Sequence, residues 1–150
     1  MKKYIITITV LSFLITALFI SSVFAKQKEQ NGYILEHEKD IVKDEPGPHD
    51  GGGNTTVYNF FTKADNSKLV FRKRVLHAGA AIGYHLQQEE EIYYIVSGTG
   101  QMTMNDKKFT VKAGDAILTL AGSSHGLKQT GTEDLVIIID YEKNKNQSAH

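Results

Sequence analysis

Side chains that could bind a metal ion stand at four positions in the second half of the sequence. His85 and Gln87 are two residues apart, so on a strand both side chains would project from the same face. Glu91 opens the next apolar run, and His125 comes much later, shortly after the turn residue Gly122. Imidazole nitrogens, an amide oxygen and a carboxylate suit a borderline divalent ion, so manganese, iron, nickel, zinc and copper are all chemically possible.

The sequence contains no cysteine, which narrows this chemistry. A disulfide, a thiolate nucleophile and a cysteine-based zinc site are all excluded, so any metal ion must be bound through nitrogen and oxygen. Glu89 and Glu90 are rival carboxylates in the same stretch, and each is more typical of a solvated loop charge. The alternative for the whole set is a hydrogen-bonded polar cluster that holds no metal.

Two further side chains are candidates for a catalytic acid or base. His49 lies in a loop rich in proline and glycine and could fold over a pocket, although a lone loop histidine is more often simply exposed. Tyr93 shares the strand face of Glu91 and could donate a hydrogen bond into the pocket. Neither residue has a spacing that identifies it as the acid or the base.

The only two arginines, Arg72 and Arg74, share one face of an expected strand. If they face inward, they would bind a carboxylate or phosphate by paired hydrogen bonds. If they face outward, with Lys73 inside, they would be ordinary surface charges, and this is the interpretation that we favour. His77, at the end of the same strand, is expected to be a surface or hydrogen-bonded histidine.

The elements that must position these residues are short strands. From residue 55 onward, apolar runs of about four to eight residues alternate with turn residues, which is typical of an all-β domain. Asn105 and Asp106 both tolerate positive φ and predict a tight hairpin turn. Eight short strands in under 100 residues predict a barrel or sandwich. The expected strands are 57–61, 69–76, 91–96, 101–104, 108–111, 116–120, 126–129 and 135–141.

The first 25 residues have the pattern of a signal peptide. Lys2 and Lys3 precede an almost wholly apolar stretch, 4–20, and Val23 and Ala25 occupy the positions that a signal peptidase recognises. We expect cleavage after Ala25 and export to the periplasm or the medium, without a membrane segment in the mature chain. The alternative is an uncleaved membrane anchor.

The rest of the chain is long enough for one domain. Of its 150 residues, 41% are hydrophobic and 23% charged, which is ordinary for a globular protein. The formal net charge is zero and no basic stripe is present, so nothing indicates nucleic-acid binding. We expect a mobile, highly charged arm over 26–47, a folded domain over 48–142 and a polar tail over 143–150.

Two stretches together resemble the sequence motifs of the small single-domain cupins. The first has the spacing of Gly79, His85, Gln87, Glu91 and Gly98. The second has the spacing of Gly114, Leu120, Gly122, His125 and Gln129. In the family a second histidine usually stands where this chain has Gln87, a proline where it has Leu120, and an asparagine where it has Gln129. The resemblance covers roughly residues 49–141.

This resemblance implies a small cupin β-barrel, also called a double-stranded β-helix or jelly roll. It also implies a divalent transition metal ion bound by His85, Gln87, Glu91 and His125, with weaker affinity because an amide replaces an imidazole. The first function hypothesis is a metal-dependent enzyme acting on a small hydroxy acid, sugar acid or dicarboxylate. The second is a non-catalytic module that binds a sugar or oxyanion, and the third is an interaction domain.

A homodimer is also implied by the resemblance, because small cupins commonly pair through strand exchange or sheet packing. The 26–47 arm would be the exchanged segment.

Overall fold

A computed structural model describes residues 32–143 of the chain. The expected signal peptide and residues 144–150 of the expected tail lie outside the described residues. Within 32–143, no helix is long and apolar enough to cross a membrane. The elements in chain order are α2 (Glu38–Ile41), β1 (Val42–Pro46), β2 (Asn54–Phe60), β3 (Leu69–Leu76), β4 (Ala81–Leu86), β5 (Glu91–Ser97), β6 (Thr99–Met104), β7 (Lys107–Lys112), β8 (Ala116–Thr119), β9 (Ser124–Gln129) and β10 (Leu135–Glu142).

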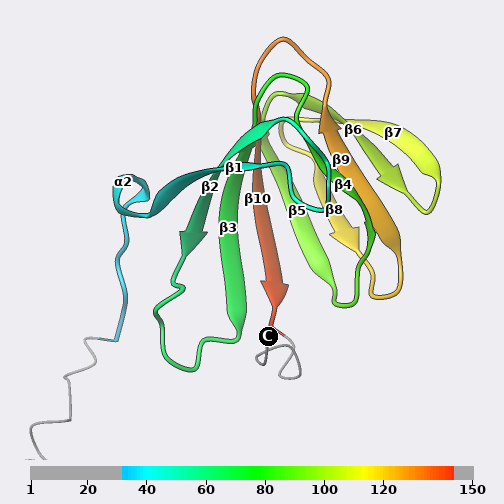
Figure 1. Cartoon of the computed structure of the whole chain (residues 1–150). Coiled ribbons are helices and arrows are strands. Elements are labelled where there is room, and N and C mark those ends of the chain that lie inside the picture. Colours follow the sequence, from blue (N-terminus) through cyan, green and yellow to red (C-terminus); the bar gives the residue numbers. More distant parts are fainter. Residues whose placement is uncertain (1–31, 144–150) are drawn as a thin grey trace, which may run out of the picture. The chain divides into compact units, whose positions relative to one another are not determined.

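The strands form two antiparallel sheets (Figure 1). The larger sheet has the order β1-β2-β3-β10-β5-β8, and the smaller has the order β4-β9-β6-β7. β6 and β7 are joined by the expected hairpin, in which Asn105 and Asp106 have φ values of 44° and 65°. Two positive φ values in a two-residue turn match the right-handed twist of the paired strands. The prediction of an all-β sandwich or barrel is confirmed.

The core comes from the inward-facing residues of both sheets. In β5, buried and exposed residues alternate along the strand from Glu91 to Val96, as expected for a strand with one face on the core. Each fully buried large aliphatic side chain contributes about 1.5–3 kcal/mol relative to an exposed one. The buried core cluster consists of Leu76, Ala80, Ile82, Tyr93, Ile95, Met102, Val111, Leu127, Leu135, Ile137 and Ile139.

Two strands are absent from the sequence-based prediction, and both bear on the site. β4 carries His85 but is interrupted by Gly83, which reads as a break in a strand pattern. β1 lies inside the segment that we expected to be a mobile arm, or to pair only with a second copy. That expectation is wrong for residues 42–46, because β1 pairs with β2 of the same chain from Val42–Tyr58 to Pro46–Asn54.

β1 differs from the expectation because one of its residues forms an ion pair with β3, a strand distant in the sequence. Nη2 of Arg74 on β3 donates to Oε1 of Glu45 on β1 at 2.7 Å. Thr55 on the intervening β2 donates its hydroxyl to the carbonyl of Glu45 at 3.0 Å. The charged segment is therefore ordered by a buried cation, which local sequence patterns do not reveal.

Candidate metal centre

His85 and His125 face each other across paired strands of the smaller sheet. Their backbones are direct partners in the β4–β9 register, and their ring centroids are 4.5 Å apart. Nδ1 of His85 donates to the carbonyl oxygen of Gly83 at 2.8 Å, since a carbonyl can only accept. In the neutral ring, Nε2 of His85 therefore carries the lone pair, the arrangement that holds a metal-binding histidine in one tautomer.

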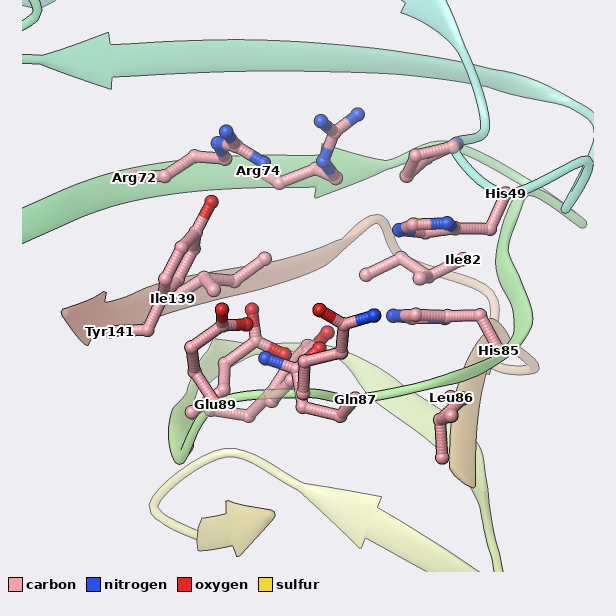
Figure 2. A pocket seen from close by; sticks show the side chains of 14 residues that line it. His49, Arg72, Arg74, Ile82, His85, Leu86, Gln87, Glu89, Ile139 and Tyr141 are labelled. Carbon is pink, nitrogen blue, oxygen red and sulfur yellow. The ribbon is translucent and has the colours of Figure 1, made fainter. Parts of the chain in front are cut away.

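Gln87 follows β4, and its backbone forms hydrogen bonds with the turn before β9. Its backbone N–H donates to the carbonyl of Ser123, and its carbonyl accepts from the N–H of Gly122, both at 2.8 Å. The residue is buried, and its side chain lines the same cavity as His85 (Figure 2). The glycine turn therefore places the first and second motifs side by side.

Glu91 enters the cluster from the other sheet, as the first residue of β5. The hydroxyl of Thr119 on β8 donates to its carbonyl at 3.1 Å and fixes the backbone. Oε2 of Glu91 lies 3.3 Å from Nε2 of His125. The structure thus brings together all four predicted ligands, His85, Gln87, Glu91 and His125, from three separate stretches of chain.

Tyr93 is the fifth member of the cluster. Its side chain is buried, and its hydroxyl lies 3.0 Å from Nε2 of His125. Burial, and next the negative charge of Glu91, raise the pKa of Tyr93 well above its ordinary value. The hydroxyl therefore keeps its proton at neutral pH and can donate to the imidazole or to a ligand.

The donor types in this cluster fit a divalent metal ion. Oε2 of Glu91 and Nδ1 of His125 are buried without a hydrogen-bond partner, and an unsatisfied carboxylate oxygen next to imidazoles is what a cation would satisfy. Within residues 32–143, however, no three His, Asp or Glu side chains are already arranged around one metal position. The hydroxyl of Tyr93 lies within hydrogen-bond distance of Nε2 of His125. This contact would have to break before Nε2 could bind an ion.

A cavity of about 240 Å³ lies beside this cluster. Figure 2 shows Arg72 and Arg74 on the wall that faces Gln87 and Glu89. Tyr141 lies at one end of the cavity, opposite the histidines. The expectation that Glu89 is a solvated loop charge is wrong, because it lines the cavity and its Oε1 atom is buried without a partner. Glu90 is exposed.

The surface interpretation that we favoured for the two arginines is also wrong. Arg74 is only 2% exposed; Nη1 donates to Oγ1 of Thr55 at 2.8 Å, Nη2 binds Glu45, and Nε is buried without a partner. Nε of Arg72 donates to Oδ1 of Asn59 at 2.6 Å, and the residue is half-buried. Both side chains line the cavity. The acceptors on β1 and β2 hold them inward, which the pattern of β3 alone does not indicate.

The carboxylate of Glu45 stays charged beside Arg74. Burial alone would raise the pKa of Glu45, but the hydrogen bond and positive charge of Arg74, with help from Lys43, lower it below its ordinary value. A charged partner for a buried guanidinium removes much of the cost of burying it.

His49 lies at the mouth of the cavity and stacks on His85. The two ring centroids are 3.5 Å apart, with 7° between the planes. Partial burial and next the neighbouring His85 lower the pKa of His49 below its ordinary value. His77 is not in this cavity; its ring nitrogens contact Thr56 and Asp134. Sequence reasoning missed Tyr141, which the alternation of Ile137, Ile139 and Tyr141 along β10 places on the inward face.

Comparisons with known proteins identify a family, a relative by sequence and a similar solved structure. The family model described as "Cupin domain" matches residues 73–140. The oxalate-binding protein of Thermotoga maritima is 31% identical over 111 residues, which is 72% of this chain and 92% of the relative. A crystal structure of a predicted oxalate decarboxylase from the same organism superposes with a TM-score of 0.67 at 28% identity, covering 74% of this chain and all of that one.

A more distant structural neighbour shows the fold alone. The polyketide cyclase RemF of Streptomyces resistomycificus has a TM-score of 0.61 at 19% identity, covering 75% of this chain and 80% of that one.

Proposed function

The chain belongs to the cupin family, and from this premise we propose that it binds a divalent transition metal ion and holds a small dicarboxylic acid against it. His85, Gln87, Glu91 and His125 would bind the ion. When bound, the ion would act as a Lewis acid for the oxygen atoms of the acid. The ligand would be close to oxalate in size.

The observation that carries this proposal is the pair of arginines across the cavity from the histidine cluster. Arg72 and Arg74 are two cations on the wall that faces Gln87 and Glu89. Guanidinium groups bind carboxylates by directed, charge-assisted hydrogen bonds. One end of a dicarboxylate would lie at the metal position and the other at the arginines.

The volume of the cavity limits the size of this acid. Pockets for drug-sized ligands usually have about 300–1,000 Å³, and this cavity has about 240 Å³. The name of the relative from Thermotoga maritima, an oxalate-binding protein, supports a ligand of this class. The histidine cluster and the two arginines of this chain support the same class of ligand.

An enzyme acting on the same acid, the function that we expected first from the sequence, is the second candidate. The buried Oε1 of Glu89 in the cavity wall favours it, because a carboxylate there could exchange protons with a ligand. Tyr93 and His49 remain the other candidates for the acid or base. A ligand that is bound but never converted would decide for the binding function.

One experiment tests both candidates. Elemental analysis of protein purified without chelator identifies the metal ion. Calorimetric titration with oxalate, malonate and succinate is then done on metal-loaded and metal-free protein. We expect oxalate to bind only to the loaded protein. Nuclear magnetic resonance of the acid after long incubation measures turnover. Equal binding by loaded and metal-free protein would contradict the proposal.

We also propose that the protein is exported, because residues 1–25 have the charge, apolar length and cleavage pattern of a signal peptide. Mass spectrometry of protein recovered outside the cytoplasm should give a chain that begins at Lys26. A chain that keeps Met1 would contradict cleavage.

A homodimer is the assembly that we propose, through the outer face of the larger sheet. Five large apolar side chains on β5, on β8 and directly after β8 are each 45–57% exposed: Ile92, Tyr94, Val96, Leu118 and Leu120. Ile92 and Leu118 are direct partners in the β5–β8 register. At roughly 100 Å² each, they offer about 500 Å², most of the ~800 Å² that one partner of a stable interface buries.

A second copy fits this face because the five side chains carry no charge, so two copies would not repel each other there. Light scattering should give a dimeric mass for the wild type and a monomeric mass for Leu118→Lys. Phe109→Lys is the matched control, since Phe109 is exposed on β7 of the other sheet. A Leu118→Lys protein that stays dimeric would contradict this interface.

A further inference from the structure

The loop of residues 47–53 is fastened to β4 by its backbone. The N–H of Gly83 donates to the carbonyl of Pro48 at 2.9 Å, and the N–H of Ala81 donates to the carbonyl of Gly52 at 3.1 Å. These bonds attach both halves of the loop to the strand that carries His85. The loop is therefore a fixed wall of the cavity.

Close packing between this loop and β4 depends on glycine on both sides. A Cβ atom on Gly83 would overlap the carbonyl oxygen of His49, and one on Gly51 would overlap the carbonyl oxygen of Ala81. Such overlaps with backbone atoms cannot be relieved by a rotamer change. The sequence thus specifies how near the backbone of His49 comes to β4.

The backbone of His49 is also held in an unusual conformation. Its φ is 53°, and the next residue, Asp50, has a φ of 57°. A residue other than glycine adopts this left-handed region at a cost, so the surrounding contacts must stabilise it. The effect of the conformation is to place the His49 ring over the His85 ring at the cavity mouth (Figure 2).

The stacked geometry excludes His49 from the ligand set of an ion that His85 binds. An ion bound by an imidazole lies close to the plane of that ring. With the ring centroids 3.5 Å apart and the planes 7° from parallel, the two rings direct their nitrogens along nearly parallel planes and would not converge on one ion. The side-chain nitrogens of His49 are left for a molecule that occupies the cavity.

We infer that His49 contacts the bound acid, an inference that rests on the proposed function. Its ring forms the wall beside the metal position, while Arg72 and Tyr141 bound the far part of the cavity. His49 is thus a residue that contacts the ligand and does not bind the ion.

The test uses the full mature chain loaded with manganese and two acids, oxalate and succinate. His49→Asn removes the ring but keeps a residue that tolerates positive φ. We expect the dissociation constant for oxalate to rise about tenfold, as for loss of a hydrogen bond to a charged ligand. Manganese affinity should change less than threefold.

Asp50→Asn is the matched control, because Asp50 has the same backbone conformation in the same loop and does not line the cavity. It should leave all three affinities unchanged. An unchanged oxalate affinity in His49→Asn would overturn the inference, and so would a tenfold loss of manganese affinity, which would make His49 a metal ligand. If the wild type binds neither acid, the proposed function itself fails.

Discussion

Two histidine-centred groups in this molecule differ in how fully their polar atoms are paired. In the first, at the cavity, Oε2 of Glu91 and Nδ1 of His125 are buried without hydrogen-bond partners. In the second, around His77, both ring nitrogens have partners, Oδ2 of Asp134 at 3.0 Å and Oγ1 of Thr56 at 2.9 Å.

The hydrogen bonds around His77 continue to a second carboxylate. Oγ1 of Thr56 donates to Oδ1 of Asp44 at 2.7 Å, so the group links β1, β2 and the segments that flank β3 and β10. Each polar side-chain group here has a partner within hydrogen-bond distance. Buried atoms without partners need an explanation, and a bound cation would supply one for Oε2 of Glu91. The comparison therefore supports the proposed ligand binding at the first group and indicates a structural role for the second.

The largest expected effect comes from removing an imidazole of the cavity. His125→Ala deletes one proposed ligand from a fully buried position, and we expect metal affinity to fall at least 100-fold. Competition titration with a chelating dye measures it. Gln87→His is the opposite variant, and an added imidazole should increase affinity about tenfold. Unchanged metal content in His125→Ala would contradict the proposed metal binding at the cavity, and with it the contrast to the group around His77.

A second variant tests whether the arginines bind the acid. Arg72→Met keeps the length of the side chain and removes its charge, so oxalate affinity should fall about 10- to 100-fold, because a charge-assisted hydrogen bond is lost. Metal affinity should stay within threefold, since Arg72 is not a proposed ligand. Arg72 is chosen over Arg74, whose burial between Thr55 and Glu45 would make its removal a test of folding. Calorimetry on metal-loaded protein gives both numbers.

The Glu45–Arg74 pair predicts a pH dependence of stability. The pKa of Glu45 is lowered in the folded state, so its stabilising effect is fully present above the ordinary value of 4.5 and is lost as pH falls through the lowered value. The wild type should be about 1–2 kcal/mol more stable than Glu45→Gln at pH 7, and this difference should shrink below pH 4.5. Urea denaturation across this range measures it, and a difference that grows with acid would contradict it.

The smallest expected effect belongs to the second histidine group. His77→Asn should lower the free energy of unfolding by less than about 1 kcal/mol, because the group is partly exposed. Its metal and oxalate affinities should equal those of the wild type. A change of threefold or more in either affinity would mean that the two groups are coupled, against the roles assigned above.

Sequence predicted those parts of the fold and site that depend on local patterns. The hairpin at Asn105 and Asp106 follows from turn chemistry, and β3 and β5 follow from apolar runs bounded by turn residues. The spacing of His85, Gln87 and Glu91 indicated the cluster that the structure brings together with His125. The resemblance between the two motifs and the cupin motifs supplied the barrel topology.

What could not be predicted depends on contacts between distant segments. β1 is ordered because Glu45 meets Arg74, 29 residues further along the chain. Arg74 faces inward for the same reason, and the charge pattern of β3 gave no sign of it. β4 was missed because Gly83 weakens a strand pattern, while its actual role is to accept a packed loop. Glu89 was assigned to solvent because no local rule shows that a cavity closes over it.

The contact between Arg74 and Glu45 makes the cationic wall of the cavity depend on the beginning of the folded chain. A protease that cut after Pro46 would leave every proposed metal ligand in place and yet remove one of the two acceptors that orient this guanidinium. N-terminal trimming would then weaken capture of the acid before it affected retention of the ion. The N-terminal residue of the purified polypeptide is therefore a variable that any affinity measurement on this protein has to control.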